Sequence, residues 1–264
     1  MLNRFIVLIA SKLLILFSNF KSFFLSGIDV KNIPIIINNR NRYTFLKMQI
    51  DALASRGYHN LIIIDNKSTY PPLLEYYKTL PYKVLLLEKN LGYLSLQKLD
   101  LYQEVRKSYF VYTDSDVVPI EDCPDDFMQY FLLKLRKNFW VSKIGFSLKT
   151  DDLPDHYDKK KEVIDWEFQF YQKKIGNDYE ALVDTTFALH KPYALISTRG
   201  IFKMLRTGYP YQAYHMPWYN DSANITQEEK YYTDHVEIGT HWSKGLEVAN
   251  KSFLGRLLLK LKGK

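Results

Sequence analysis

The chain has 264 residues, enough for one large domain or two small ones with a substantial core. Its single cysteine, Cys123, excludes an intrachain disulfide and a cysteine zinc cluster. The net charge is +7, of which residues 1–28 carry +3 and residues 244–264 carry +5, so the remaining body carries −1. A nearly neutral body argues against a nucleic-acid groove, whereas basic and apolar ends point to an anionic membrane surface.

The N-terminal 30 residues are predicted to associate with a membrane. Two apolar runs, residues 5–10 and 13–17, flank Ser11 and Lys12. Neither run reaches the roughly 18–20 residues of a transmembrane helix, and Phe23 and Phe24 stand where a signal peptide would have small residues. We expect a helix that lies in the interface or inserts weakly, with a buried core helix and a signal anchor as the alternatives.

From residue 32 onward, strands and helices are expected to alternate as they do around a parallel sheet. The expected strands cover residues 33–37, 61–64, 84–87 and 109–113, and the expected helices cover residues 44–56, 72–80 and 94–106. Each strand is followed by polar side chains, which are those of Asn38, Asn39, Arg40, Asp65, Asn90, Asp114 and Asp116. Ligands of open α/β sheets bind beyond the carboxyl ends of the strands. The sequence therefore predicts an α/β fold with a mostly parallel central sheet flanked by helices, and a ligand site at that edge.

Two aspartates, Asp114 and Asp116, end the apolar run that begins at Tyr109. Burying two unpaired carboxylates costs several kcal/mol unless a cation or strong donors compensate. Magnesium and manganese favour such oxygen ligands together with substrate phosphates. The two aspartates therefore indicate a metal site, and an acidic turn or a helix cap is the alternative interpretation.

Beyond residue 120 the pattern is looser. We expect a helix at 127–135, a strand at 145–148, a charged segment at 157–174 and an alternating strand at 182–189. Residues 209–242 combine aromatic, histidine and acidic side chains with little periodicity, as in a loop region that faces a substrate. Sugar rings stack on aromatic side chains, so an acceptor platform and simple packing are both open for Tyr209, Tyr211, Tyr214, Trp218 and Tyr219.

The last 21 residues, 244–264, are expected to form a basic amphipathic helix. One stripe of this helix would carry Phe253, Leu254, Leu257, Leu258 and Leu261, and another would carry Arg256, Lys260 and Lys264. The helix could bind a membrane surface or dock on the domain with a solvated lysine face.

Taken together, the strands and their polar ends resemble nucleotide-sugar glycosyltransferases of the GT-A type, particularly the family-two-like bacterial enzymes that build surface polysaccharides. The resemblance rests on residues 35–40, 62–69, 90–92 and 112–116, in that order on successive strands. It covers residues 32–120 well and only loosely beyond. It implies a Rossmann-like GT-A domain at residues 31–243, with a nucleotide-donor half at 31–120 and an acceptor half at 121–243.

The resemblance also implies a ligand and a role for each predicted site residue. The ligand would be a nucleoside-diphosphate sugar, such as a UDP- or GDP-sugar, with Mn²⁺ or Mg²⁺ as the metal. The donor-binding set would be Asn39, Arg40 and Asp65 for the base and ribose, Asn90 in the third loop, and Asp114 for the ribose or donor sugar. Asp116 would bind the metal with Asp114 nearby, and His241 would complete the metal shell, with weaker claims for His215 and His235. An Asx turn is the alternative for Asp65, and an ordinary hydrogen-bonded residue is the alternative for His241.

The catalytic base is less clearly marked. Family-two enzymes present an acidic pair at a helix start in the second half, and the chain has no clean copy of it. Asp184 is the candidate base and Glu229 a weaker one, together with Glu228 and Asp234. Asp184 could equally be a strand-end acid bonded to nearby hydroxyls or to Lys191. A retaining enzyme would need no such base, so the stereochemistry stays open.

The implied function is metal-dependent transfer of a sugar to a glycan or lipid-linked acceptor at the cytoplasmic face of the cell membrane, with no nucleic-acid partner. The non-enzymatic alternative is a nucleotide-sugar or glycan binding protein at the membrane surface. A sugar-phosphate nucleotidyltransferase is disfavoured, because residues 38–42 contain no glycine for a phosphate loop.

Overall fold

The computed structural model describes residues 2–183, 186–196 and 202–237, with side chains from residue 9 onward. The chain divides into two compact units, Met1–Asn224 and Ile225–Lys264. The described part of the second unit contains helix α7 (Gln227–Asp234). The elements below belong to the first unit.

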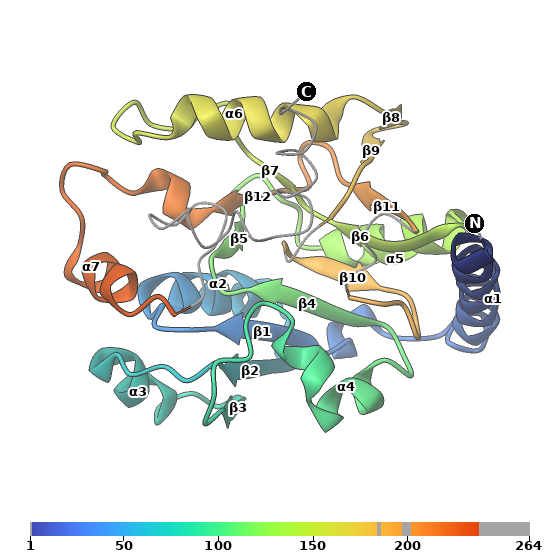
Figure 1. Cartoon of the computed structure of the whole chain (residues 1–264), viewed down its shortest axis with the longest axis horizontal. Helices are drawn as coiled ribbons and strands as arrows, with labels where there is room; N and C mark the ends of the chain where they lie inside the picture. Colours follow the sequence, from blue (N-terminus) through green and yellow to red (C-terminus); the bar gives the residue numbers. More distant parts are fainter. Residues whose placement is uncertain (1, 184–185, 197–201, 238–264) are drawn as a thin grey trace. The chain divides into compact units, whose positions relative to one another are not determined.

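Four parallel strands form one half of the main sheet, in the order β3-β2-β1-β4 (Figure 1). They are β1 (Ile35–Asn39), β2 (Leu61–Asp65), β3 (Lys83–Leu86) and β4 (Phe110–Asp114). The connecting helices are α2 (Thr44–Ser55), α3 (Pro71–Tyr77), η2 (Ser95–Lys98) and α4 (Asp100–Val105). The predicted order of strands and helices is confirmed for this half. The expected helix at 94–106 is two pieces, because Leu99 has an extended backbone.

The main sheet continues beyond β4 with strands of both directions. Strand β10 (Ala188–His190) lies antiparallel between β4 and β6 (Val141–Gly145). The strands that follow are β11 (Lys203–Arg206), β9 (Asp178–Glu180) and β8 (Lys174–Ile175). The sheet therefore has nine strands within the described residues and is mixed, with a parallel half, rather than mostly parallel. The expected strand at 182–189 is shorter and shifted, because only residues 188–190 pair with neighbours.

A second sheet of three strands forms next to β4, in the order β5-β12-β7. Its strands are β5 (Val117–Pro119), β12 (Gln212–His215) and β7 (Ser147–Leu148). The expected strand at 145–148 is split between the two sheets at Phe146. Gly145 lies at this crossing, where an added Cβ would come within 2.6 Å of Val183 and 2.8 Å of the Phe187 carbonyl oxygen. Strand β12 lies in the region expected to lack periodicity, and its pairing with β5 is what forms it.

The core lies on both faces of the main sheet. On one face, η2 and α4 cover β1, β2 and β4 through Ile36, Ile64, Leu96, Tyr102, Phe110, Tyr112 and Ile196. Elsewhere helix α5 (Phe127–Lys137) packs on β6, and the rings of Phe127, Phe131, Phe146 and Phe187 contact one another. Helix α6 (Lys160–Phe168) precedes η3 (Gln169–Tyr171) and the β8-β9 pair.

Residues 2–24 form one continuous helix, α1 (Leu2–Phe24), followed by η1 (Val30–Asn32). The predicted N-terminal helix is thus confirmed as a helix. Figure 1 shows α1 at one edge of the first unit, on the opposite side from α3. Among the described residues, no helix combines the length and the apolar character needed to cross a membrane.

Candidate functional site

The predicted site lies where the strand order of the main sheet reverses. From β1 the chain moves outward to β2 and β3, and it returns to the other side of β1 as β4. Ligands of open α/β sheets bind at such a switch point, beyond the carboxyl ends of the strands. The register places Asn38 opposite Asp114 and Asn39 opposite Asp65. The structure therefore brings these predicted residues together at one sheet edge.

A buried chain of hydrogen bonds links β1 and β2 at this edge. The Nδ2 of Asn39 donates to the Tyr77 hydroxyl at 2.8 Å, and that hydroxyl donates to Oδ2 of Asp65 at 2.7 Å. Oδ1 of Asp65 accepts from the Ser68 N–H at 2.8 Å, a local bond to the backbone three residues on rather than the two residues of an Asx turn. Burial, followed by the charge of Asp65, raises the pKa of Tyr77 and keeps it a donor. Asn39 and Asp65 are 1% and 2% exposed. They position the loops in this structure, and their contact with a nucleotide stays a prediction.

The loops that follow β1 and β2 are tied to each other. Arg40 donates through Nη1 to the carbonyl oxygens of Asn66 and Lys67, both at 2.9 Å. Asn41 adopts the left-handed backbone (φ 51°), and its Oδ1 accepts from the N–H groups of Thr69 and Tyr70. These bonds hold the two loops in one arrangement at the switch point.

The third predicted loop is joined to the same edge. Oδ1 of Asn90 accepts from the Gly92 N–H at 2.9 Å, and Nδ2 of Asn66 donates to the Gly92 carbonyl oxygen at 3.0 Å. Oδ1 of Asn66 also accepts from the Leu91 N–H. Asn90 thus shapes the loop after β3, and its contact with a donor stays a prediction.

Gln49 of α2 holds the turn that carries the two aspartates. Its Nε2 donates to the carbonyl oxygen of Asp114 at 2.9 Å and to that of Val117 at 2.6 Å. Gln49 is fully buried, so these bonds form in a low-dielectric setting where they constrain the backbone strongly. Sequence reasoning missed this residue. The available signal was a polar side chain within the apolar side of the expected helix at 44–56.

Asp116 and His215 face each other across the junction of the two sheets. The Oδ1 of Asp116 lies 3.8 Å from Nε2 of His215, too far for a hydrogen bond. This Oδ1 is buried and has no hydrogen-bond partner among the described residues. Strand pairing sets the approach, because His215 lies opposite Val117 and the Met216 N–H donates to the Asp116 carbonyl oxygen at 2.9 Å. From the sequence His215 was only a weaker metal candidate than His241.

The electrostatics of this pair suit a metal ligand set. Burial lowers the pKa of His215, Asp116 opposes that shift, and the nearby charge of Arg42 adds to it. The imidazole is therefore held neutral, with a ring nitrogen free to act as a ligand. An unpartnered carboxylate oxygen and a neutral imidazole nitrogen are a donor set that divalent metals accept. No group of three or more His, Cys, Asp or Glu side chains gathers within the part of the chain described, so a metal here would also need ligands from a substrate.

The remaining predicted site residues lie outside the described residues or in the second unit. Asp184 and His241 lie outside the described residues, as does the expected helix at 244–264. Glu229 belongs to the second unit, in the first turn of α7, where its N–H donates to the Thr226 hydroxyl at 3.1 Å. This contact is a helix cap, and a catalytic role for Glu229 stays a prediction.

Four of the five aromatic residues expected as an acceptor platform divide into two groups. Trp218 is buried against His215, with ring centroids 4.6 Å apart, and Tyr211 stacks on Tyr130 at 3.9 Å, so both pack as the alternative proposed. Tyr214 and Tyr219 are partly exposed and meet edge to face at 5.0 Å. Their hydroxyls donate to carboxylates, Tyr214 to Glu121 at 2.5 Å and Tyr219 to Asp152 at 2.7 Å.

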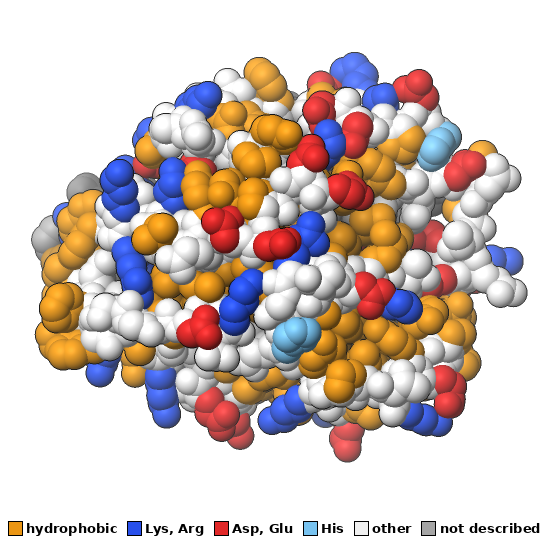
Figure 2. Space-filling model, turned by 180° about the vertical axis from the view of Figure 1, so that it is seen from behind, with side chains coloured by type: hydrophobic (Ala, Val, Ile, Leu, Met, Phe, Trp, Pro, Cys, Tyr) orange, Lys and Arg blue, Asp and Glu red, His pale blue; other side chains and the backbone are white. Residues whose placement is uncertain are grey.

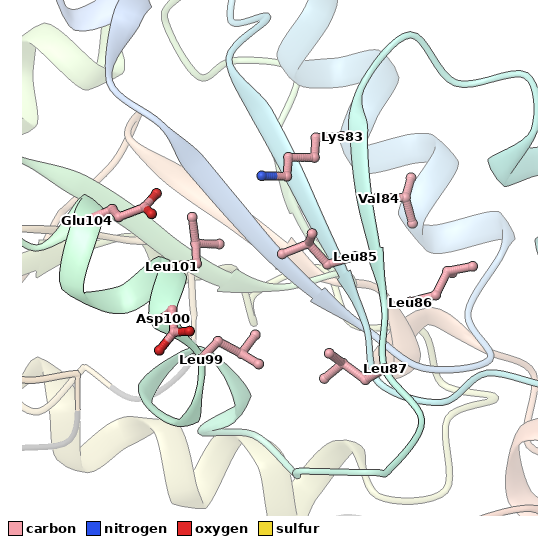
Figure 3. A pocket seen from close by; sticks show the side chains of 9 residues that line it. All are labelled: Lys83, Val84, Leu85, Leu86, Leu87, Leu99, Asp100, Leu101 and Glu104. Atoms are coloured by element: carbon pink, nitrogen blue, oxygen red, sulfur yellow. The ribbon is translucent and has the colours of Figure 1, made fainter.

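A shallow hollow of about 410 Å³ lies elsewhere, between β3 and α4. Figure 3 shows Leu85 and Leu87 pointing toward α4 while Val84 and Leu86 point away, as expected for a strand. The hollow is lined mainly by leucines, and none of the predicted site residues lines it. Lys83, Asp100 and Glu104 also line it, and it does not contribute to the candidate site.

Compared with models of protein families and with curated proteins, the chain matches none of them. Two structural observations define the candidate site. Polar strand ends meet at the switch point of the sheet, and an unpartnered oxygen of Asp116 faces His215.

Proposed function

We propose that this protein is a metal-dependent glycosyltransferase of the GT-A type, which moves a sugar from a nucleoside-diphosphate donor to a glycan or lipid-linked acceptor. The observation that carries the proposal is the buried, unpartnered Oδ1 of Asp116, 3.8 Å from Nε2 of His215. A carboxylate oxygen without a donor is costly to bury, and a cation removes that cost. Its place at the switch point suits a ligand that carries phosphates.

Asp116 and His215 would hold the metal, and phosphate oxygens of the donor and water would supply its remaining ligands. Manganese is favoured over magnesium, because magnesium prefers an all-oxygen shell and the pair offers an imidazole nitrogen. When bound, the metal neutralises the departing nucleoside diphosphate. Asp114, partly exposed and opposite Asn38, is assigned to the ribose or donor sugar. The positive charge of Arg42, which acts on His215, complements a diphosphate.

The protein would contribute to the reaction by holding the carboxyl edge of the parallel strands in a fixed arrangement. Gln49 fixes the turn from Asp114 to Val117, and the chain from Asn39 through Tyr77 to Asp65 fixes the neighbouring loops. Groups held in place before the substrate arrives do not have to be ordered during the reaction, which lowers the barrier. Tyr214 and Tyr219, with their carboxylate partners, are assigned to the acceptor because rings and carboxylates suit sugar C–H faces and hydroxyls. Asp184 remains the candidate base.

Donor hydrolysis tests the proposal without knowledge of the acceptor. The purified protein is incubated with UDP- and GDP-sugars and Mn²⁺ or Mg²⁺, and the released nucleoside diphosphate is measured. We expect hydrolysis of one donor, and a fall of about 100-fold or more in Asp116→Asn, because the metal supplies several kcal/mol of charge stabilisation. The matched control is Asp165→Asn, which removes an exposed carboxylate of α6 that pairs with Lys161.

Two results would contradict the proposal. Full hydrolysis by Asp116→Asn in Mn²⁺ would remove Asp116 from the metal site. Donor binding by calorimetry that needs no metal, survives Asp116→Asn and is never followed by hydrolysis would favour the non-catalytic nucleotide-sugar binding protein instead.

A further inference from the structure

Helix α1 packs on the rest of the first unit through a side that is mainly polar. The buried residues of its described part are Ile15, Ser18 and Ser22. Its opposite side carries Ile9, Leu13, Leu16, Phe17, Phe20, Phe23 and Phe24, which are 42–75% exposed. Spacings of three and four residues place these side chains on one stripe. A surface helix normally buries its apolar stripe, so α1 has the opposite orientation.

Polar contacts hold α1 in this orientation. The Nδ2 of Asn19 donates to the Phe139 carbonyl oxygen at 3.0 Å, and the Nζ of Lys191 donates to Oδ1 of Asn19 at 2.9 Å. At the end of the helix, Nη2 of Arg136 donates to the Leu25 carbonyl oxygen at 2.7 Å. These bonds need the polar side of α1 to face inward. The exposed stripe is therefore a consequence of how the helix is docked.

The apolar surface extends beyond α1. Phe139 and Trp140, which follow α5, are 41% and 50% exposed, and the contact of Asn19 with Phe139 places them beside α1. Figure 2 shows hydrophobic side chains gathered at the edge of the molecule where α1 lies, with Lys and Arg side chains among them. We call the exposed stripe of α1 with Phe139 and Trp140 the α1 face. Apolar patches of this kind mark interaction surfaces, and tryptophan is enriched where membranes meet water.

The charges around the α1 face select its partner. Helix α1 contains no aspartate or glutamate. Lys12 on α1 and Lys137 at the end of α5 are exposed, and Lys21 lies over the Phe17 ring at 5.5 Å. Residues 244–264 of the chain carry +5, and a second copy would present the same lysines. Like charge disfavours residues 244–264 and a second copy as partners of the α1 face, whereas basic residues near a membrane surface attract anionic lipid headgroups.

We propose that the α1 face binds an anionic lipid surface, with α1 lying in the plane of the headgroups and its Leu and Phe side chains in the acyl boundary. This proposal rests on the docking of α1 and does not require the proposed glycosyl transfer. Lipid binding needs no turnover, so either proposal can fail while the other stands.

Flotation of the full-length protein with vesicles tests this inference. The vesicles contain phosphatidylcholine alone, or phosphatidylcholine with phosphatidylglycerol. The test variant is Leu13→Gln with Phe23→Gln, and the matched control is Leu86→Gln with Phe168→Gln, which removes one Leu and one Phe that are equally exposed elsewhere. We expect binding to the anionic vesicles only, a fall of about tenfold or more in the partition coefficient of the test variant, and no change in the control.

A second measurement reports which surface touches the lipid. Brominated acyl chains should quench tryptophan fluorescence in the wild type, and the quenching should be lost in Trp140→Phe and retained in Trp166→Phe, which alters an exposed Trp of α6. Wild-type flotation by the Leu13→Gln, Phe23→Gln protein would overturn the proposal. The proposal would also be overturned if this variant kept its vesicle binding and changed its oligomeric state, as measured by size-exclusion chromatography with light scattering. The α1 face would then bind a second copy of the chain.

Discussion

Oδ1 of Asp116 and Nε2 of His215 lie 3.8 Å apart at the junction of the two sheets, and neither residue reaches the other through a hydrogen bond. The pairing of β12 with β5 creates this approach. One atom is an unpartnered carboxylate oxygen and the other belongs to an imidazole whose pKa is lowered by burial. The geometry of these two residues is the basis for the proposed metal and for the proposed ligand that carries phosphates.

The first prediction concerns His215. We expect His215→Ala to weaken Mn²⁺ binding in the presence of a nucleoside diphosphate by about 10- to 100-fold, because one of two protein ligands is lost. Titration calorimetry or electron paramagnetic resonance of Mn²⁺ measures this. His59→Ala, which changes an exposed histidine far from β12, is the control. Equal Mn²⁺ affinity in both variants would show that His215 is not a ligand.

The second prediction concerns Gln49. Gln49→Leu removes the amide donor from the carbonyl oxygens of Val117 and of Asp114, of which the latter keeps the Thr113 hydroxyl. We therefore expect the free energy of unfolding to fall by about 1–3 kcal/mol. We also expect weaker Mn²⁺ binding, because the aspartate turn loses its support, and Gln49→Glu should not restore it since its carboxylate cannot donate. Gln129→Leu on the exposed side of α5 is the control. A destabilised variant with unchanged Mn²⁺ affinity would limit Gln49 to a structural role.

The third prediction concerns Tyr77. Tyr77→Phe removes the hydroxyl that joins Asn39 to Asp65 and leaves two buried polar groups unpaired. We expect a loss of about 1–3 kcal/mol in the free energy of unfolding, measured by urea denaturation. Tyr82→Phe, at a partly exposed position, should change it little. If the two variants were equally stable, the chain of hydrogen bonds would contribute nothing to the fold.

The fourth prediction concerns pH. Burial lowers the pKa of Lys191 from 10.5 to about 7, although three oxygen acceptors surround its ammonium group. Between these two pKa values the unfolded chain binds more protons than the folded one, so stability rises with pH. The loss of folding stability caused by burying the charged Lys191 is fully present below pH 7 and is relieved as the pH rises above 7. Relative to Lys191→Met, the wild type should gain about 3 kcal/mol in the free energy of unfolding between pH 7 and 9.5.

Denaturant titrations at several pH values measure this difference. Lys161→Met, which alters an exposed lysine of α6, should follow the wild type at every pH. Parallel curves for the wild type and Lys191→Met would show that Lys191 keeps an ordinary pKa in the folded protein.

The parallel half of the main sheet could be predicted from the sequence because its signals are local. Residues 35–37 and 61–64 are apolar at every position, as in strands that are covered on both faces. The helices between them show apolar residues at helical spacing. Polar residues stand where each apolar run ends. The carboxyl ends of parallel strands share one edge, so Asn39, Asp65 and Asp114 could be placed together before any contact was known.

Other features depend on partners that lie far away in the chain. The antiparallel position of β10, and the split of residues 145–148 between the two sheets at Phe146, follow from pairing with strands far away in the chain. Such pairing produces no periodic pattern of apolar residues in the local sequence. His215 becomes a site residue only because β12 pairs with β5, and Gln49 only because α2 packs beside the turn at Asp114.

By itself, the sequence determined the order of the elements in the parallel half of the main sheet, the polar strand ends and the amphipathic, basic character of the N-terminus. These properties depend on neighbouring residues and on the geometry of single helices and strands. The tertiary structure decided that His215 approaches Asp116 and which side of α1 faces the body. The approach of His215 depends on the pairing of β12 with β5. The orientation of α1 depends on hydrogen bonds to residues far away in the chain, and leaving such polar groups unpaired would cost free energy.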